Sequence, residues 1–138
     1  MALVLDTSVL LAGLDAADPD HQRCAELILG SRETLVVPAL VLSELDYWCH
    51  QRLTAAVWLD FLEDLLGGAY RVETPSYDDL GRCHALQATY EDLAVGVVDA
   101  SILALVERLQ EPKLATLDHR HFATMRPEHV TALELVPV

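Results

Sequence analysis

The stretch Ala2–Ser8, ALVLDTS, decides how the chain begins to fold. Its apolar residues predict a short buried strand, and the Thr7-Ser8 pair that follows is typical of a helix start. Asp6 therefore lies where a strand gives way to a helix. In open α/β sheets, ligands bind at this edge, outside the carboxyl ends of the strands. Because a buried carboxylate is costly unless it is paired or holds a metal, Asp6 needs partners from elsewhere in the chain.

The rest of the chain alternates between helices and strands. Helices are predicted over 7–14, 18–29, from Pro38 onward, 54–67, 76–90 and 97–109, and a loop over 92–96. Strands are predicted over 34–37, 70–73, 113–117 and 131–136. This order predicts an α/β fold with a central, mainly parallel sheet of four to five strands flanked by helices. Without a linker or an internal repeat, we expect a single domain over residues 1–138.

Composition limits the class of protein. Hydrophobic residues make up 52% and charged residues 22% of the chain, as in folded globular proteins. No apolar run approaches the ~20 residues that span a bilayer, and the first residues lack the basic flank and cleavage site of a signal peptide. We therefore expect a cytoplasmic protein with no membrane segment. The separated cysteines, Cys24, Cys49 and Cys83, are expected to be buried thiols and not a metal set.

The chain is strongly acidic. Its 9 Lys and Arg face 22 Asp and Glu, for a net charge of −13. Taken alone, this balance favours a cation, a basic partner or simple solubility, and it is the opposite of the basic surface of nucleic-acid binders. A local stripe of arginines can still exist on an acidic protein. The candidates for phosphate contacts, each of which also fits a solvated surface charge, are Arg23, Arg52, Arg120 and Arg126.

Four carboxylates are candidates for one site. Asp6 and Asp118 each end an apolar strand, and parallel strands end at the same edge of a sheet. Asp99 lies in the first turn of the 97–109 helix, where the helix dipole favours negative charge. Glu44 lies within the apolar face of the helix that begins at Pro38. That face is formed by Val41, Leu42, Leu45 and Trp48.

Acids that converge in this way repel one another, and each raises the pKa of the others. A hard divalent cation such as Mg²⁺ relieves the repulsion and prefers oxygen ligands. Each acid also has a structural interpretation. An Asp ahead of a helix is commonly an N-cap, which would account for Asp6 or Asp99, and Glu44 could reach solvent or an arginine.

Four segments carry a family resemblance. They are VLDTSVLLA at 4–12, VPALVLSELDYW at 37–48, VGVVDASILALVERL at 95–109 and LATLDHRHF at 114–122. In this order and spacing, the chain resembles PIN-domain proteins, and specifically the VapC-type toxins of bacterial toxin–antitoxin pairs. The resemblance covers nearly the whole chain and implies a PIN-like α/β domain.

The resemblance also implies a metal-dependent endoribonuclease that cleaves structured RNA, either tRNA or rRNA. By motif, Asp6, Glu44, Asp99 and Asp118 are then the catalytic acids, with Asp6 and Asp99 as direct ligands of Mg²⁺ or, as a substitute, Mn²⁺. Such an ion activates water and stabilises the charge that develops at phosphorus. The hydroxyl positions that hold such carboxylates in place are matched by Thr7, Ser8 and Thr116.

The resemblance implies protein partners as well. These are a VapB-like antitoxin that holds the activity off, in a toxin–antitoxin hetero-oligomer, and a second copy of the chain in a homodimer. An antitoxin peptide with a basic side chain would suit a groove beside the acids. The exposed helical face that receives it is expected to include Trp48, Trp58 and Phe61. The two tryptophans also fit core or interface positions, because both have apolar neighbours on their helices.

His119 and His121 flank Arg120 directly after Asp118. Either could be a metal ligand. Because no cysteine or third histidine is spaced for a zinc site, a surface or loop position is the preferred interpretation for both.

Two other classes of function stay open. A catalytically silent PIN-fold interaction module would keep the acids for a protein partner, but four carboxylates without a cation would destabilise it. A Mg²⁺-dependent phosphatase or a receiver-like signalling domain also places aspartates at strand ends. However, Asp6-Thr7-Ser8 lacks the second Asp that haloacid-type phosphatases use two residues on. A receiver-like domain needs an adjacent acidic pair after the first strand and a lysine late in the fold, and the only lysine, Lys113, precedes its strand instead of following it.

Overall fold

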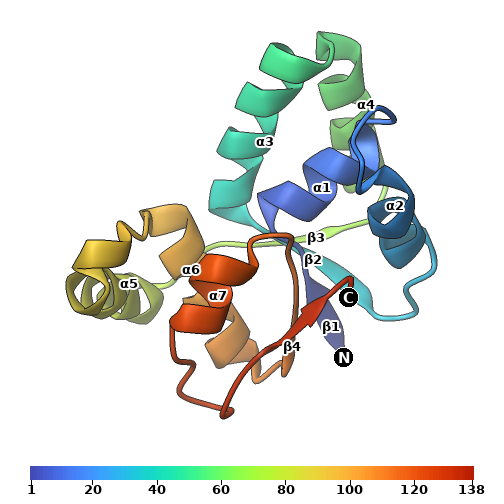
Figure 1. Cartoon of the computed structure of the whole chain (residues 1–138). Coiled ribbons are helices and arrows are strands. Elements are labelled where there is room, and N and C mark those ends of the chain that lie inside the picture. Colours follow the sequence, from blue (N-terminus) through green and yellow to red (C-terminus); the bar gives the residue numbers. More distant parts are fainter.

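The computed structural model describes residues 1–138 and consists of short strands and helices in alternation (Figure 1). The strands are β1 (Ala2–Val4), β2 (Thr34–Pro38), β3 (Arg71–Glu73), β4 (Lys113–Ala115) and β5 (Glu134–Val136). The helices are α1 (Thr7–Leu14), α2 (His21–Leu29), α3 (Ala39–Arg52), α4 (Ala55–Leu66), α5 (Tyr77–Thr89), α6 (Val97–Leu109) and α7 (His119–Thr124). A 3-10 turn, η1 (Glu91–Leu93), separates α5 from α6. The predicted α/β class is confirmed.

All strand pairs are parallel. β1, β2 and β3 form one sheet, in that order, and β4 pairs with β5 in a second. A bridge between Leu5 and Ala115 joins the two, and the Asp6 N–H donates to the Ala115 carbonyl at 2.9 Å. The strands therefore follow one another in space as β3, β2, β1, β4, β5, which agrees with the predicted strand number. After β1, the chain adds β2 and β3 on one side of that strand and later adds β4 and β5 on its other side. The topological switch point therefore lies between β1 and β4.

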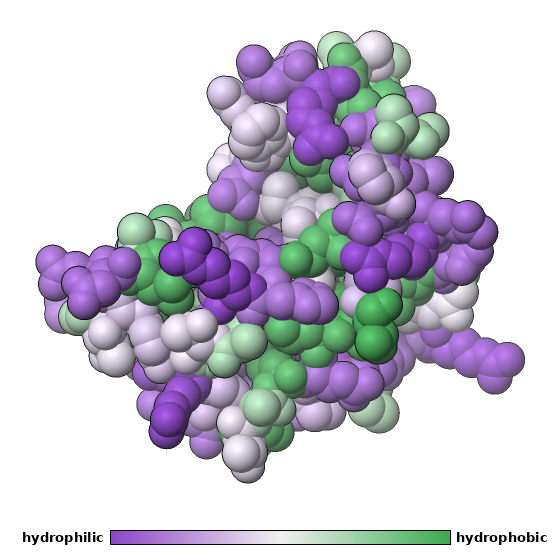
Figure 2. All heavy atoms as spheres, viewed as in Figure 1, coloured by the Kyte–Doolittle hydropathy of each residue, from purple (hydrophilic) through white to green (hydrophobic).

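The helices cover this sheet in two groups. α1 packs against α2 and α3, while α5 packs against α6, which also contacts α3 and β2. Figure 1 shows α3 and α4 rising side by side above α1, with α5 and α6 on the other flank and α7 overlapping α6 in this view. Figure 2 shows the same face as mainly hydrophilic, with small hydrophobic groups between, and its outline is indented between the α3–α4 pair and the α5–α6 part.

α6 is buried on all sides along most of its length. Every residue from Ala100 to Glu107 is buried, so the helix has no wet face over two turns. Ser101 and Glu107 are the polar residues within this buried stretch. Glu107 can be buried because the Arg82 guanidinium donates to both of its carboxylate oxygens, at 2.8 and 3.0 Å.

Several predicted boundaries are wrong. α2 begins at His21 and not at Asp18-Pro19, because the Asp18 carboxylate accepts the N–H of Asp20 at 2.8 Å and closes a turn ahead of the helix. β4 ends at Ala115, not at residue 117, and β5 begins at Glu134, not at residue 131. η1 occupies the start of the predicted loop.

α7 was not predicted at all. At six residues it is too short for a helical period to show, and it is held by its N-cap Asp118 and by the buried Phe122. His119 and His121 therefore lie on a helix and not in a loop, and the exposed His119 agrees with the surface alternative of the prediction.

The inner face of α3 is also different from the prediction. Val41, Leu45 and Cys49 are its buried residues, at i, i+4 and i+8. Trp48 lies one position off this stripe and is 41% exposed. All three cysteines are free and buried, as predicted. None of the helices combines the length and the apolar character needed to cross a membrane.

Candidate metal centre

Asp6 occupies the seam between the two parts of the sheet. It follows β1, and its extended backbone at the N-cap of α1 directs the chain from strand to helix. The residue is only 4% exposed, yet each carboxylate oxygen has donors. Oδ1 accepts the Thr7 N–H at 2.7 Å, and Oδ2 accepts the hydroxyls of Thr116 at 2.6 Å and Ser8 at 2.9 Å. A buried carboxylate is tolerated here because its lone pairs are satisfied.

The two hydroxyls link Asp6 to the segment after β4. Ser8 Oγ accepts the Leu117 N–H at 3.0 Å, and Thr116 Oγ1 accepts the Asp118 N–H at 2.9 Å. Each hydroxyl therefore accepts a hydrogen bond from a backbone N–H of this segment and donates a hydrogen bond to Asp6. This network fixes the start of α1 against the approach to α7, two segments more than 100 residues apart in sequence.

Glu44 reaches the same edge from α3. The Thr7 hydroxyl donates to Glu44 Oε1 at 2.6 Å. Glu44 is partly buried, and its charge is near enough to Asp6 to raise the pKa of that carboxyl. The Glu44 position within the apolar side of α3 thus serves to aim its carboxylate at the start of α1.

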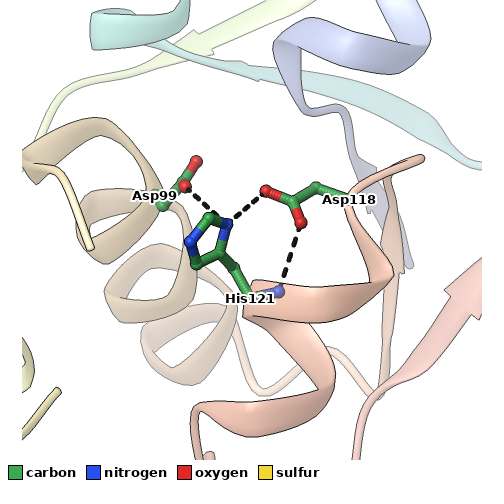
Figure 3. A group of neighbouring side chains, drawn as sticks. All are labelled: Asp99, Asp118 and His121. Atoms are coloured by element: carbon green, nitrogen blue, oxygen red, sulfur yellow. Dashed lines mark hydrogen bonds and ion pairs between the residues drawn. The ribbon is translucent and has the colours of Figure 1, made fainter. Parts of the chain in front are cut away.

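Asp99, Asp118 and His121 form the other side of the site (Figure 3). Asp99 comes from the first turn of α6, and Asp118 is the N-cap of α7. One ligand-type atom from each of the three side chains lies within 4.8 Å of the others. His121 Nδ1 is 2.7 Å from Asp118 Oδ2 and 3.8 Å from Asp99 Oδ2, so the ring stands between the two carboxylates.

The His121 ring faces acceptors on both nitrogens. Nδ1 donates to Asp118, and Nε2 lies 3.3 Å from the carbonyl of Leu93 in η1. Because a carbonyl only accepts, a ring that serves both partners carries two protons and a positive charge. The hydrogen bond to Asp118 accordingly raises the pKa of His121 above its ordinary value. His121 is the cation that the protein itself supplies to the acids.

One cation is too little for this set of acids. Burial raises the pKa of Asp6, although the hydroxyls of Thr116 and Ser8 oppose the rise. The pKa of Asp99 is raised to about 7, first by burial and then by the charges of Asp6 and Asp118. Unlike the other three acids, Asp99 accepts no hydrogen bond, and its nearest charged partner is His121. The site therefore holds its own negative charge at a cost in free energy.

The donor chemistry fits a hard divalent cation. Carboxylate oxygens at one crevice are the ligands such ions prefer, and a bound ion would remove the repulsion that Asp99 experiences. The residues that could hold it are the four predicted acids, which the structure brings to the switch point of the sheet. The predicted hydroxyls of Thr7, Ser8 and Thr116 each contact one of these acids.

His121 lies in the site although a surface or loop position is the interpretation that its sequence favours. A metal ligand is the less preferred alternative there because no zinc-type set accompanies it. Its spacing of three residues from Asp118 carried a signal, since a short helix capped by Asp118 would bring both to one side.

One other expectation needs correction, and the four candidate arginines differ in their pairing. Phe61 is only 1% exposed, in a stack with Trp58 whose ring centroids are 5.8 Å apart, so it is no part of an exposed face. Arg23 is neutralised by Asp20 at 2.8 Å. Arg52 pairs with Asp15 and Asp18, at 3.0 and 3.3 Å. Arg120 and Arg126 are exposed and make no ion pair.

Comparison with known proteins agrees with this architecture. Residues 3–126 match the PIN domain family. The chain is 36% identical over 125 residues, which are 91% of this chain and 93% of the relative, to "Ribonuclease VapC26" of Mycobacterium tuberculosis (strain ATCC 25618 / H37Rv).

Solved structures share the fold. The structure of M. tuberculosis VapC20, described as a Sarcin-Ricin loop cleaving toxin, superposes with a TM-score of 0.80 at 19% identity, covering 95% of this chain and 99% of that one. VapBC2 from Rickettsia felis, bound to a DNA fragment from its promoter, gives 0.72 at 17% identity and covers 99% and 100%.

The charge balance of the site predicts an inverted pH dependence of stability. Asp99 and His121 both bind protons more tightly in the folded state, so the free energy of unfolding should fall as pH rises from about 4 to about 8 in EDTA. Each pH unit between the ordinary pKa of Asp99 and its raised pKa of about 7 corresponds to ~1.4 kcal/mol. The charge of Asp99 therefore destabilises the folded state by on the order of a few kcal/mol at neutral pH and above. We therefore expect Asp99→Asn to be more stable than the wild type at about pH 8 and to lose less stability on going there from about pH 5.

Urea unfolding at a series of pH values measures this difference. Asp60→Asn, which neutralises an exposed acid on α4, is the matched control and should follow the wild type. Parallel pH curves for wild type and Asp99→Asn would show that Asp99 carries no excess charge cost.

Proposed function

The chain belongs to the PIN domain family, in its VapC group, and we propose that it is the endoribonuclease toxin of a toxin–antitoxin pair. The proposed reaction is hydrolysis of a phosphodiester in structured RNA, tRNA or rRNA, with Mg²⁺ as the cofactor and Mn²⁺ as a substitute. The observation that carries the proposal is the meeting of Asp6, Glu44, Asp99 and Asp118 at the switch point of the sheet. Identity to a ribonuclease over nearly its whole length supports the same activity.

The protein prepares this site before any ligand binds. Ser8 and Thr116 fix the Asp6 carboxylate, and Thr7 fixes that of Glu44. Carboxylates aligned in advance need no reorganisation when charge develops at the reacting phosphate. A divalent cation held here by Asp6 and Asp99, with Glu44 and Asp118 completing the site, would supply Lewis-acid stabilisation and water activation.

Arrangement of the basic residues suggests where RNA lies. Six of the nine Lys and Arg are engaged in ion pairs with Asp or Glu: Arg23, Arg52, Arg71, Arg82, Arg108 and Lys113. The three without such a pair are Arg32, Arg120 and Arg126. Of these, Arg120 lies next to His121 on α7, so we propose that the phosphate backbone approaches the acids across α7.

We also propose a VapB-like antitoxin as the partner and a homodimer as the toxin's own state. A cluster of acids with a single histidine as counter-charge would accept a basic side chain of the antitoxin. With Phe61 in the core, the exposed aromatics available on α3 are Tyr47 and Trp48, which pack edge to face at 5.1 Å.

Cleavage of purified tRNA and rRNA tests the activity. We expect cleavage with Mg²⁺ or Mn²⁺, none in EDTA, and a loss of roughly 10²-fold or more in both Glu44→Gln and Asp99→Asn, because each removes charge from the reacting site while keeping its shape. Glu63→Gln, on the exposed side of α4, is the control and should cleave like the wild type.

Equal cleavage by all variants would point to a contaminating nuclease. Absence of both cleavage and calorimetric cation binding would sink the enzyme proposal and favour the silent interaction module.

Salt dependence of RNA binding tests the α7 approach. In EDTA, Arg120→Gln should weaken tRNA binding in fluorescence anisotropy and lower the slope of log K against log salt by about one, the value for a lost phosphate contact. Arg23→Gln removes a charge that Asp20 already offsets, so its slope should match the wild type. An unchanged slope in Arg120→Gln would move the RNA path away from α7.

Partner binding is measured by co-expression with candidate VapB-like proteins. We expect a stable hetero-oligomer that no longer cleaves RNA, and light scattering of the toxin alone should give the mass of a dimer. Full cleavage by a purified complex with such a protein would contradict the inhibitory role.

A further inference from the structure

His121 is placed as metal-binding histidines are placed. The Nε2–H is directed at the Leu93 carbonyl, 3.3 Å away, which fixes that nitrogen as the donor. Nδ1 is left as the nitrogen that faces the two acids. In metal sites, a histidine typically gives its outer N–H to a carbonyl or carboxylate in this way, and the inner nitrogen then binds the ion.

Its surroundings hold the ring in this orientation from two directions. On α7, the Asp118 carboxylate accepts the His121 backbone N–H at 3.2 Å, so residue and partner share one helical turn. On the other side, η1 presents the Leu93 carbonyl, and the turn ends at Ala94 with a φ of 54°. A left-handed alanine is uncommon and slightly unfavourable, so this turn is held in its conformation at a small cost in free energy.

The combined donor set is mixed. Asp99 and Asp118 offer oxygens, His121 offers a nitrogen, and one atom of each lies within 4.8 Å of the others. Mg²⁺ takes oxygen ligands almost exclusively, whereas nitrogen ligands favour first-row transition ions. A histidine between two aspartates therefore changes which cation the site prefers.

We propose that His121 Nδ1 and Asp118 bind the divalent cation directly, in addition to the ligands Asp6 and Asp99 of the proposed function, and that His121 gives the site a preference for Mn²⁺ over Mg²⁺. This inference rests on the cation site of the proposed function. On binding, the Nδ1 proton goes to solvent and the freed lone pair takes the ion, while Nε2 keeps its hydrogen bond to Leu93. The positive charge of the doubly protonated ring between the two carboxylates is thereby replaced by the larger charge of the divalent cation.

Pulsed electron paramagnetic resonance of bound Mn²⁺ tests the proposal directly. Electron spin echo modulation from ¹⁴N is expected in the wild type and should change to the ¹⁵N pattern when the histidines are ¹⁵N-labelled. His121→Gln, whose amide can still donate to Asp118, should lose the modulation. His119→Gln, which alters the exposed neighbour on the same helix, should retain it.

Calorimetry adds a second readout that does not depend on activity. In His121→Gln, Mn²⁺ affinity should fall roughly 10-fold or more while Mg²⁺ affinity changes by less than about 3-fold, because only the transition ion gains from nitrogen. Circular dichroism confirms that each variant is folded.

The outcomes separate the two levels of inference. Mn²⁺ that binds the wild type without ¹⁴N modulation would overturn His121 as a ligand and leave the carboxylate site of the proposed function intact. Wild-type protein that binds neither cation would overturn both.

Discussion

The buried Asp6 carboxylate is the constraint on which the rest of the structure depends. Its backbone N–H joins β1 to β4 through Ala115, and its side chain gathers the hydroxyls of Ser8 and Thr116. A charge that is only 4% exposed would be prohibitive without those donors. The requirement to satisfy it therefore ties the first turn of the chain to the last strands, and that tie creates the switch point at which the other acids collect.

Negative charge exceeds positive charge at the switch point. Glu44, Asp99 and Asp118 come from three different helices or their caps, and only His121 answers them from within the protein. The pKa of Asp99 is raised to about 7 first by its burial and then by the neighbouring charges of Asp6 and Asp118, so part of the shift reflects this imbalance. A fold that keeps such a cost in one crevice stores free energy that an incoming cation or basic group can release.

The acidity of the whole chain and a nuclease site are compatible because charge is distributed unevenly. Most arginines form salt bridges within the protein, such as Arg82 with the buried Glu107 and Arg108 with Asp79. These pairs hold α5 on α6 and contribute no free positive charge. The positive charge that remains free to bind a polyanion is confined to a few arginines. One of them, the exposed Arg120, lies on the same helix as His121.

The sequence by itself determined the α/β class and the strand–acid junctions, and it selected the four acids and the three hydroxyls that the structure brings together, because apolar runs, caps and motifs are local patterns. It missed α7 and preferred a surface or loop position for His121, and it counted Trp48 in the apolar face of α3 as well as in an exposed face, of which only the second agrees with its 41% exposure. A six-residue helix shows no period, and a histidine takes its meaning from groups distant in sequence, here the Leu93 carbonyl and Asp99. Only the tertiary structure decided which side chains surround the ring, since hydrogen bonds and charge repulsion act through space.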